Sequence, residues 1–274
     1  METTSKGTVG VGVVQFHATP GDRAGNLAVA EAQLRAMAEA DLDIAVLPEL
    51  FGSGYDMAAD LDRAAEDLRG PTVTELTRIA ADLDIVIATT VLSRTDRGEL
   101  VNRAVVLSGA GVLASADKTR LWGAERGTFA PGDGELAVAR TPLATIGIAV
   151  CYEAGFPESA RALARQGVDI IAMPSAFGRQ RMHAWDLMTR SRALENGCFV
   201  VAAGMCGENA TGTQFAGTSR IVDPRGTVLL ELGAAAGCGV RAIDLAEIEH
   251  ARTEIPYLAD LGIDLTPAGA GSIG

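Results

Sequence analysis

The chain has 274 residues, of which 48% are hydrophobic and 21% are charged, and its formal net charge is −12 at pH 7. This composition is typical of a globular protein, and no apolar run approaches the roughly eighteen residues that a membrane span needs. The acidic balance argues against nucleic acids and anionic membranes as partners, because both need clustered Lys and Arg.

The first half predicts strands and helices in alternation, since short β-branched runs are followed by Ala- and Leu-rich segments. Its expected elements are a strand over 9–16, a helix over 24–40, a strand over 43–47, a loop over 52–58, a helix from Gly70-Pro71-Thr72 to Leu83, paired strands over 85–92 and 100–107, and a short strand running toward Lys118. Residues 119–134 predict an irregular segment, with a candidate strand over 135–140.

The second half repeats this alternation. Its expected elements are a strand ending at Cys151, a helix from Pro157 to Gly167, a strand over 169–173, a helix over 182–196, a strand over 199–205, and a hairpin of 214–222 and 227–232 about the turn 223–226. Beyond residue 255 the signals fade into a C-terminal tail, which we expect to be mobile or docked on a partner subunit.

The two halves resemble each other in matching order. VGVVQF at 11–16 matches IGIAVCY at 146–152, and DIAVLPE at 43–49 matches DIIAMPS at 169–175. Two copies of one strand-helix-strand-helix-strand-strand unit predict an α/β fold, a four-layer αββα sandwich of two mixed sheets related by a pseudo-twofold repeat. We expect one domain over residues 1–274.

Cys151 closes a buried strand just before a helix, where the positive helix end lowers a thiol pKa and favours thiolate. The alternative is a buried structural cysteine. Glu49 and Lys118 also close predicted strands, so a carboxylate base and an ammonium that stabilises an oxyanion are available for acyl chemistry. Each of them is also explained as an ordinary turn or surface residue.

The N-terminus, METTSKGTVG, lacks the basic and apolar regions of a signal peptide, so we expect a cytoplasmic protein. The cysteines form no CxxC pair, so we expect reduced thiols and neither a disulfide scaffold nor a metal site. They are Cys151, Cys198, Cys206 and Cys238.

Five segments resemble the nitrilase or carbon–nitrogen hydrolase superfamily in its order and spacing: PELF at 48–51, DKTRLWGAERGTFAPGD at 117–133, VCYEAGFPESARALARQGVDIIAMPS at 150–175, SRALENGCFVVAAG at 191–204 and FAGTSRIVDPRGTVL at 215–229. The resemblance implies Cys151 as nucleophile, Glu49 as general base and Lys118 as the residue that steadies the tetrahedral intermediate. It also implies Glu125 as a second glutamate that orients substrate or Lys118, and the N–H of Tyr152 as an oxyanion donor. It implies no cofactor, a small-molecule amide as substrate, and a homodimer or larger homo-oligomer.

Within the superfamily, Tyr152-Glu153 after the cysteine resembles the amidase and carbamoylase branches. Branches that act on carboxylate-bearing substrates often place Arg where this chain has Gly155, so we expect a neutral or cationic amide. Possible pocket walls, each also explained as core packing, are Tyr55, Trp122, Phe177 and Trp185.

Other functions stay open at this point. A carbamoyl-amine hydrolase, an ω-amidase and a nitrilase acting on nitriles share the chemistry. A Cys–His protease is disfavoured because His17, His183 and His250 lie in no recognisable protease motif. A non-catalytic member that binds a ligand is the non-enzyme alternative.

Overall fold

The computed structural model describes residues 7–209 and 211–263, which form two six-stranded mixed sheets. The first sheet has the order β12-β1-β2-β3-β4-β5 and the second β11-β10-β9-β8-β7-β6. The first consists of β1 (Thr8–Gln15), β2 (Ile44–Val46), β3 (Val86–Arg94), β4 (Leu100–Ser108), β5 (Gly111–Asp117) and β12 (Gly237–Asp244). The second consists of β6 (Val138–Arg140), β7 (Thr145–Ile148), β8 (Ile170–Ser175), β9 (Phe199–Gly204), β10 (Arg220–Val222) and β11 (Val228–Glu231).

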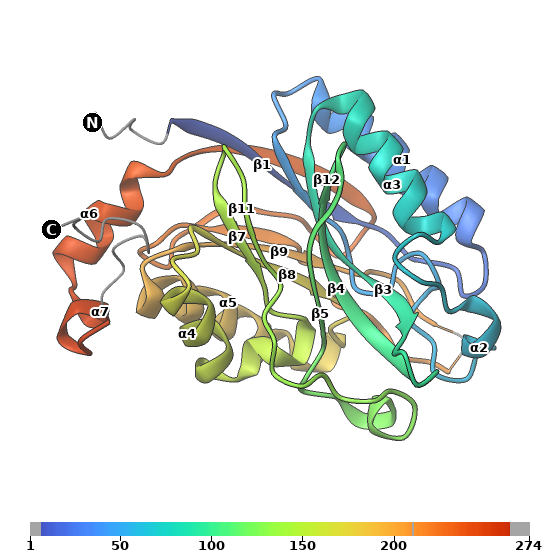
Figure 1. Cartoon of the computed structure of the whole chain (residues 1–274). Helices are drawn as coiled ribbons and strands as arrows, with labels where there is room; N and C mark the ends of the chain where they lie inside the picture. The colour runs from blue at the N-terminus through green and yellow to red at the C-terminus, as the bar shows by residue number, and fades with distance from the viewer. Residues whose placement is uncertain (1–6, 210, 264–274) are drawn as a thin grey trace, which may run out of the picture.

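Helices cover the outer face of each sheet, which confirms the predicted αββα sandwich (Figure 1). The first sheet carries α1 (Arg23–Ala38) and α3 (Pro71–Leu83), and the second carries α4 (Pro157–Arg165) and α5 (Met182–Asn196). Shorter helices are α2 (Leu61–Ala64), α6 (Ala246–Glu254) and α7 (Tyr257–Asp260), with 3₁₀ helices η1 (Gly123–Gly127), η2 (Cys151–Gly155) and η3 (Arg179–Arg181). As predicted, α3 and α4 begin at a proline, where the missing N–H costs no hydrogen bond.

Alternating side chains of β1 build two separate cores. Val9, Val11 and Val13 point into the core between the sheets, whereas Val14 joins the core under α1 and α3. Gly12 also faces α1, and a Cβ there would lie 2.6 Å from Leu42 and 2.9 Å from Met37. The glycine therefore lets α1 approach the sheet closely.

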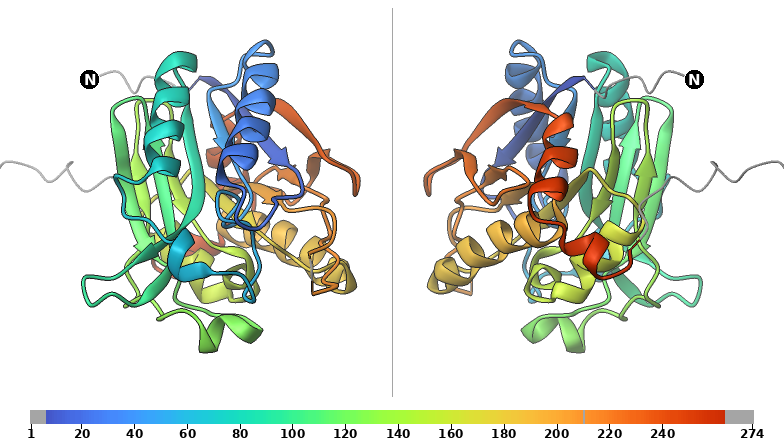
Figure 2. Two further views of the ribbon diagram at one scale, coloured as in Figure 1. Left: turned by 90° about the vertical axis from the view of Figure 1, so that its right-hand side faces the viewer. Right: turned by 90° about the vertical axis from the view of Figure 1, so that its left-hand side faces the viewer.

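The halves share one topology, with an exchange of strands between them. Each unit of five strands is followed by a strand that pairs antiparallel with the first strand of the other unit: β6 with β7, and β12 with β1. Figure 2 shows the orange-red β12 beside the blue β1. The matched segments found in the sequence are thus equivalent strands of the two sheets.

Several predicted boundaries were wrong or incomplete. The segment 214–222 is a strand only over Arg220–Val222, and β12 and α6 were not predicted. Part of the predicted tail forms α7, while 264–274 lie outside the described residues. Among the described residues, no helix has the length and apolarity to cross a membrane.

Candidate active site

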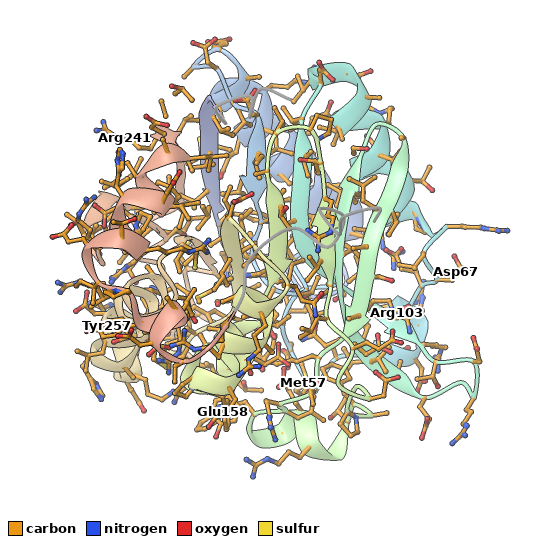
Figure 3. All side chains as sticks on the ribbon, turned by 60° about the vertical axis from the view of Figure 1, so that its left-hand side comes forward. Met57, Asp67, Arg103, Glu158, Arg241 and Tyr257 are labelled. Atoms are coloured by element: carbon orange, nitrogen blue, oxygen red, sulfur yellow. The ribbon has the colours of Figure 1, made fainter. Side chains whose placement is uncertain are left out.

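Three polar groups stand where strands end at the same end of the sandwich. Glu49 follows β2, Lys118 directly follows β5, and Cys151 opens η2 just after β7. Carboxyl ends of neighbouring strands converge at one edge, so the topology gathers residues that lie far apart in the sequence. Glu125 joins them from η1 and, like Glu49, is 0% exposed. In Figure 3 the label of Met57 marks this end of the molecule, and Glu158 of α4 is labelled near it.

Lys118 binds both carboxylates. Its Nζ lies 2.7 Å from Glu49 Oε1, and 2.8 and 2.9 Å from the two oxygens of Glu125. Burial alone lowers the pKa of Lys118, but the charges of Glu49, Cys151 and Glu125 outweigh burial and raise that pKa above its ordinary value. The side chain is therefore a fixed ammonium. It is also the only lysine among the described residues, since the only other one in the chain is Lys6.

Two further donors fix the orientation of Glu49. Asn102 Nδ2 donates to Oε1 at 2.8 Å, and the backbone N–H of Ala176 donates to Oε2 at 3.0 Å. Glu125 is fixed similarly, because Trp122 N–H donates to its Oε2 at 2.6 Å. Burial and the charge of Glu49 raise the pKa of Glu125 despite the opposing effect of Lys118.

Cys151 has an unusual backbone and an uncharged thiol. Its φ of 47° lies in the left-handed region, which non-glycine residues adopt at functional turns when the surrounding structure compensates. The prediction of a lowered pKa was wrong: burial first, then the charge of Glu49, raise the pKa of Cys151 well above its ordinary value, although Lys118 opposes them. The helix that was expected to act on the thiol, α4, begins only at Pro157.

Glu153 connects the two sides of the site, a role that the sequence did not reveal. Its Oε1 accepts hydrogen bonds from Thr119 N–H at 2.8 Å and Arg120 N–H at 3.3 Å, and its Oε2 accepts one from Val150 N–H at 2.8 Å. The carboxylate therefore joins the backbone next to Lys118 to the backbone next to Cys151. Its position two residues after the cysteine was the only available signal.

A cavity of about 520 Å³ opens onto Cys151 and Glu125. Four predicted wall or donor residues line it: Tyr55, Trp122, Tyr152 and Phe177. Trp185 does not, because it is 0% exposed, stacks behind Phe177 and donates its Nε1–H to Thr218 O at 3.0 Å. Burial and the nearby charge of Glu49 raise the pKa of Tyr55, so its hydroxyl stays protonated.

Other chemistries lack residues at this cavity. None of His17, His183 and His250 is among its lining residues, so the Cys–His alternative has no base there. Within residues 7–209 and 211–263, no group of His, Cys, Asp and Glu side chains is arranged to hold a metal ion. The four cysteines are unpaired.

A buried thiol, a fixed ammonium and two carboxylates beside one cavity define a thiol hydrolase of α/β sandwich architecture. The chain belongs to the carbon-nitrogen hydrolase family, whose model matches residues 10–253.

Relatives and solved structures agree with this assignment. The chain is 32% identical over 254 residues to an (R)-stereoselective amidase of Pseudomonas sp, covering 90% of this chain and 89% of that protein. A carbon-nitrogen hydrolase superfamily protein of Xanthomonas campestris, solved with an arsenic adduct in its active site, is 28% identical with a TM-score of 0.84, covering 92% of this chain and 97% of the other. A variant of an amidase of Nesterenkonia sp. AN1, solved with the acetamide moiety of fluoroacetamide covalently added at its active-site cysteine, is 26% identical with a TM-score of 0.81, covering 92% and 97%.

Proposed function

We propose that this protein hydrolyses a small linear amide to a carboxylic acid and ammonia through a thioester on Cys151. The observation that carries the proposal is the buried group of Glu49, Lys118 and Glu125, in which Lys118 Nζ lies 2.7 and 2.8 Å from the two carboxylates, beside a cavity that Glu125 lines together with Cys151. Membership of a carbon-nitrogen hydrolase family and amidase relatives support the same reaction.

The first half of the reaction forms the thioester. The Cys151 sulfur attacks the amide carbon while the thiol proton passes to Glu49, which suits a thiol that is neutral at rest. The carbonyl oxygen becomes an oxyanion, stabilised by the Lys118 ammonium and by the N–H of Tyr152, which lies in the first turn of η2. The C–N bond then breaks, and the proton on Glu49 moves to the nitrogen, which leaves as ammonia.

The second half returns the free enzyme. Water attacks the thioester carbon and gives a proton to Glu49, the C–S bond breaks, the acid leaves, and the sulfur regains the proton. Glu125 keeps Lys118 in place through both halves, since it holds the ammonium with both oxygens. The reaction needs no cofactor.

Ammonia release from aliphatic amides, carbamoylated amines, ω-amides and nitriles tests the proposal. We expect amides to be the best substrates, with no release by Cys151→Ala and at least a 1,000-fold lower kcat for Glu49→Gln, since the general base is lost. Preferred turnover of nitriles would contradict the amidase assignment. No turnover of any compound by folded protein would favour a ligand-binding member.

We also propose a cytoplasmic homo-oligomer, formed by a single domain over residues 1–274. Large apolar side chains exposed on and after α5 and α7 support an interface between copies: Leu187, Leu194, Tyr257 and Leu261. Size-exclusion chromatography with light scattering measures the mass of the assembly in solution. Leu187→Glu should shift that mass toward the mass of the monomer. A monomeric wild type would contradict this part.

A further inference from the structure

We propose that Arg181 forms a subsite for an anionic group of the substrate, so that the preferred amide carries a carboxylate at its far end. The inference rests on the proposed amide hydrolysis, and it replaces the expectation of a neutral or cationic amide that Gly155 suggested.

The guanidinium of Arg181 is held in the wall of the cavity that contains Cys151. Its Cζ lies 4.7 Å from the ring centre of Trp122 and 5.6 Å from that of Phe177. Gly178 lies against a third side of the guanidinium, since a Cβ added at this glycine would lie 2.7 Å from Arg181 Nη2. Stacking of this kind restricts the side chain before any ligand arrives, so little further entropy is lost on binding.

The positive charge of Arg181 lies in the wall of the cavity. Among the residues that the structure describes, no carboxylate forms an ion pair with it. Within residues 7–209 and 211–263, the acids that line the cavity are Asp56 and Glu125. Glu125 pairs with Lys118, and Asp56 Oδ1 accepts a hydrogen bond from Ala58 N–H at 2.9 Å. A planar guanidinium without a partner, on a largely apolar wall, is a preferred site for bidentate binding of a carboxylate.

The two rings that hold the guanidinium adjoin the reacting groups. Trp122 packs on Tyr152, the neighbour of Cys151, with ring centres 4.8 Å apart. Phe177 follows Ala176, whose N–H binds Glu49. Arg181 and Cys151 thus line one cavity and are connected through contacting aromatic rings. The cavity of about 520 Å³ has room for a second group beyond the amide. Monoamides of short dicarboxylic acids match this arrangement.

Three amides of similar length test the subsite: glutaramate, its uncharged analogue glutaramide, and the cationic 4-aminobutanamide. We expect wild-type kcat/KM to be at least tenfold higher for glutaramate than for either of the others. Arg181→Met keeps an apolar chain against the rings and removes the charge. It should lower kcat/KM for glutaramate about 10- to 100-fold, the usual effect of losing a charged hydrogen-bonded pair, and change that for glutaramide less than threefold.

Arg179→Met is the matched control. Arg179 belongs to the same 3₁₀ helix, is exposed and does not line the cavity, so both amides should keep their wild-type kinetics. Gly178→Ala offers a second variant that leaves the charge in place. The backbone there has φ −75°, which alanine adopts freely, so the added methyl group displaces only the guanidinium. It should lower the preference for glutaramate in the same direction.

Calorimetry separates this inference from the proposed reaction. Glutaramate binding to Cys151→Ala should weaken at least tenfold when Arg181→Met is added, whether or not the wild type turns over any amide. If the wild type turns over no amide while glutaramate binding still depends on Arg181, the proposed reaction is refuted and the subsite is supported. Equal losses for glutaramate and glutaramide in Arg181→Met, a wild-type preference for the cationic amide, or unchanged glutaramate affinity would each refute the subsite.

Discussion

Replacing Glu153 by Gln tests whether this buried carboxylate aligns the two sides of the active site. Glu153 accepts three backbone hydrogen bonds, from Thr119 and Arg120 on one oxygen and from Val150 on the other. Gln has the same shape, but its NH₂ group must face at least one of these N–H donors. The variant therefore loses the bond on one side of the site and leaves a donor unpaired there.

The size of the effect follows from these contacts. Hydrogen bonds to a charged group contribute about 1.5–3 kcal/mol each, and neutral ones about 1 kcal/mol. We expect Glu153→Gln to lower the free energy of unfolding by about 2–4 kcal/mol, which lowers Tm by about 10 °C in a chain of this size. Since a shift of about 1 Å between reacting groups costs up to 100-fold, kcat should fall about 10- to 100-fold. KM should change little, because Glu153 does not line the cavity.

Ammonia release, measured at saturating and limiting amide well below Tm, separates kcat from KM, and thermal unfolding reports stability. Glu158→Gln is the control, because Glu158 is exposed at the start of α4 and should behave as wild type. If folded Glu153→Gln keeps kcat within twofold of wild type, the carboxylate does not align the site. A rise in KM at unchanged kcat would instead indicate contact with substrate.

Three other substitutions have defined outcomes. Lys118→Met leaves two buried carboxylates without their cation, so urea unfolding should show a loss of about 3–5 kcal/mol and ammonia release should vanish; a stable variant would contradict the ion-pair geometry. Burial raises the pKa of the Cys198 thiol from 9.0 to about 12, so the unfolded chain loses this proton first, and stability falls as pH rises above 9. Between pH 8 and 10, the free energy of unfolding, measured in urea, should fall by about 1.4 kcal/mol more for the wild type than for Cys198→Ala. An identical fall in both proteins would refute this prediction. Trp185→Phe should lower the free energy of unfolding by about 1–2 kcal/mol, because the hydrogen bond to Thr218 is lost, and should leave KM within twofold of wild type. A large change in KM would instead place Trp185 in the substrate site.

The sequence predicted well wherever a structural role depends on local pattern. The strands ending near Glu49, Lys118 and Cys151 are short β-branched runs with clear terminators, and the structure reproduces them as β2, β5 and β7. The repeat then indicated how distant strand ends meet. This local information predicted the sandwich, whereas the resemblance to the nitrilase superfamily indicated which of these residues share one site and added Glu125 to them.

What the sequence missed depends on distant partners. The segment of β12, GCGVRAID, has two glycines and a largely half-exposed or exposed pattern, and becomes a strand because β1 offers an open edge. The pKa of Cys151 likewise depends on the charges of Glu49, Lys118 and Glu125, which are all distant from it in the sequence. Trp185 was predicted as a wall residue because aromatic type alone does not distinguish side chains that line a cavity from those that pack behind them.

The scarcity of lysine turns the buried ammonium into a reporter of local opening. Within the described residues, a lysine-specific protease has a single cleavage point, after Lys118, and the folded chain hides that side chain completely. The rate of this one cut therefore measures how often the interior of the active site is exposed to solvent. Trypsin, which also cuts after the many arginines, measures opening of the rest of the molecule. Comparing the two digests with and without a bound amide would show whether substrate closes the site or the whole sandwich.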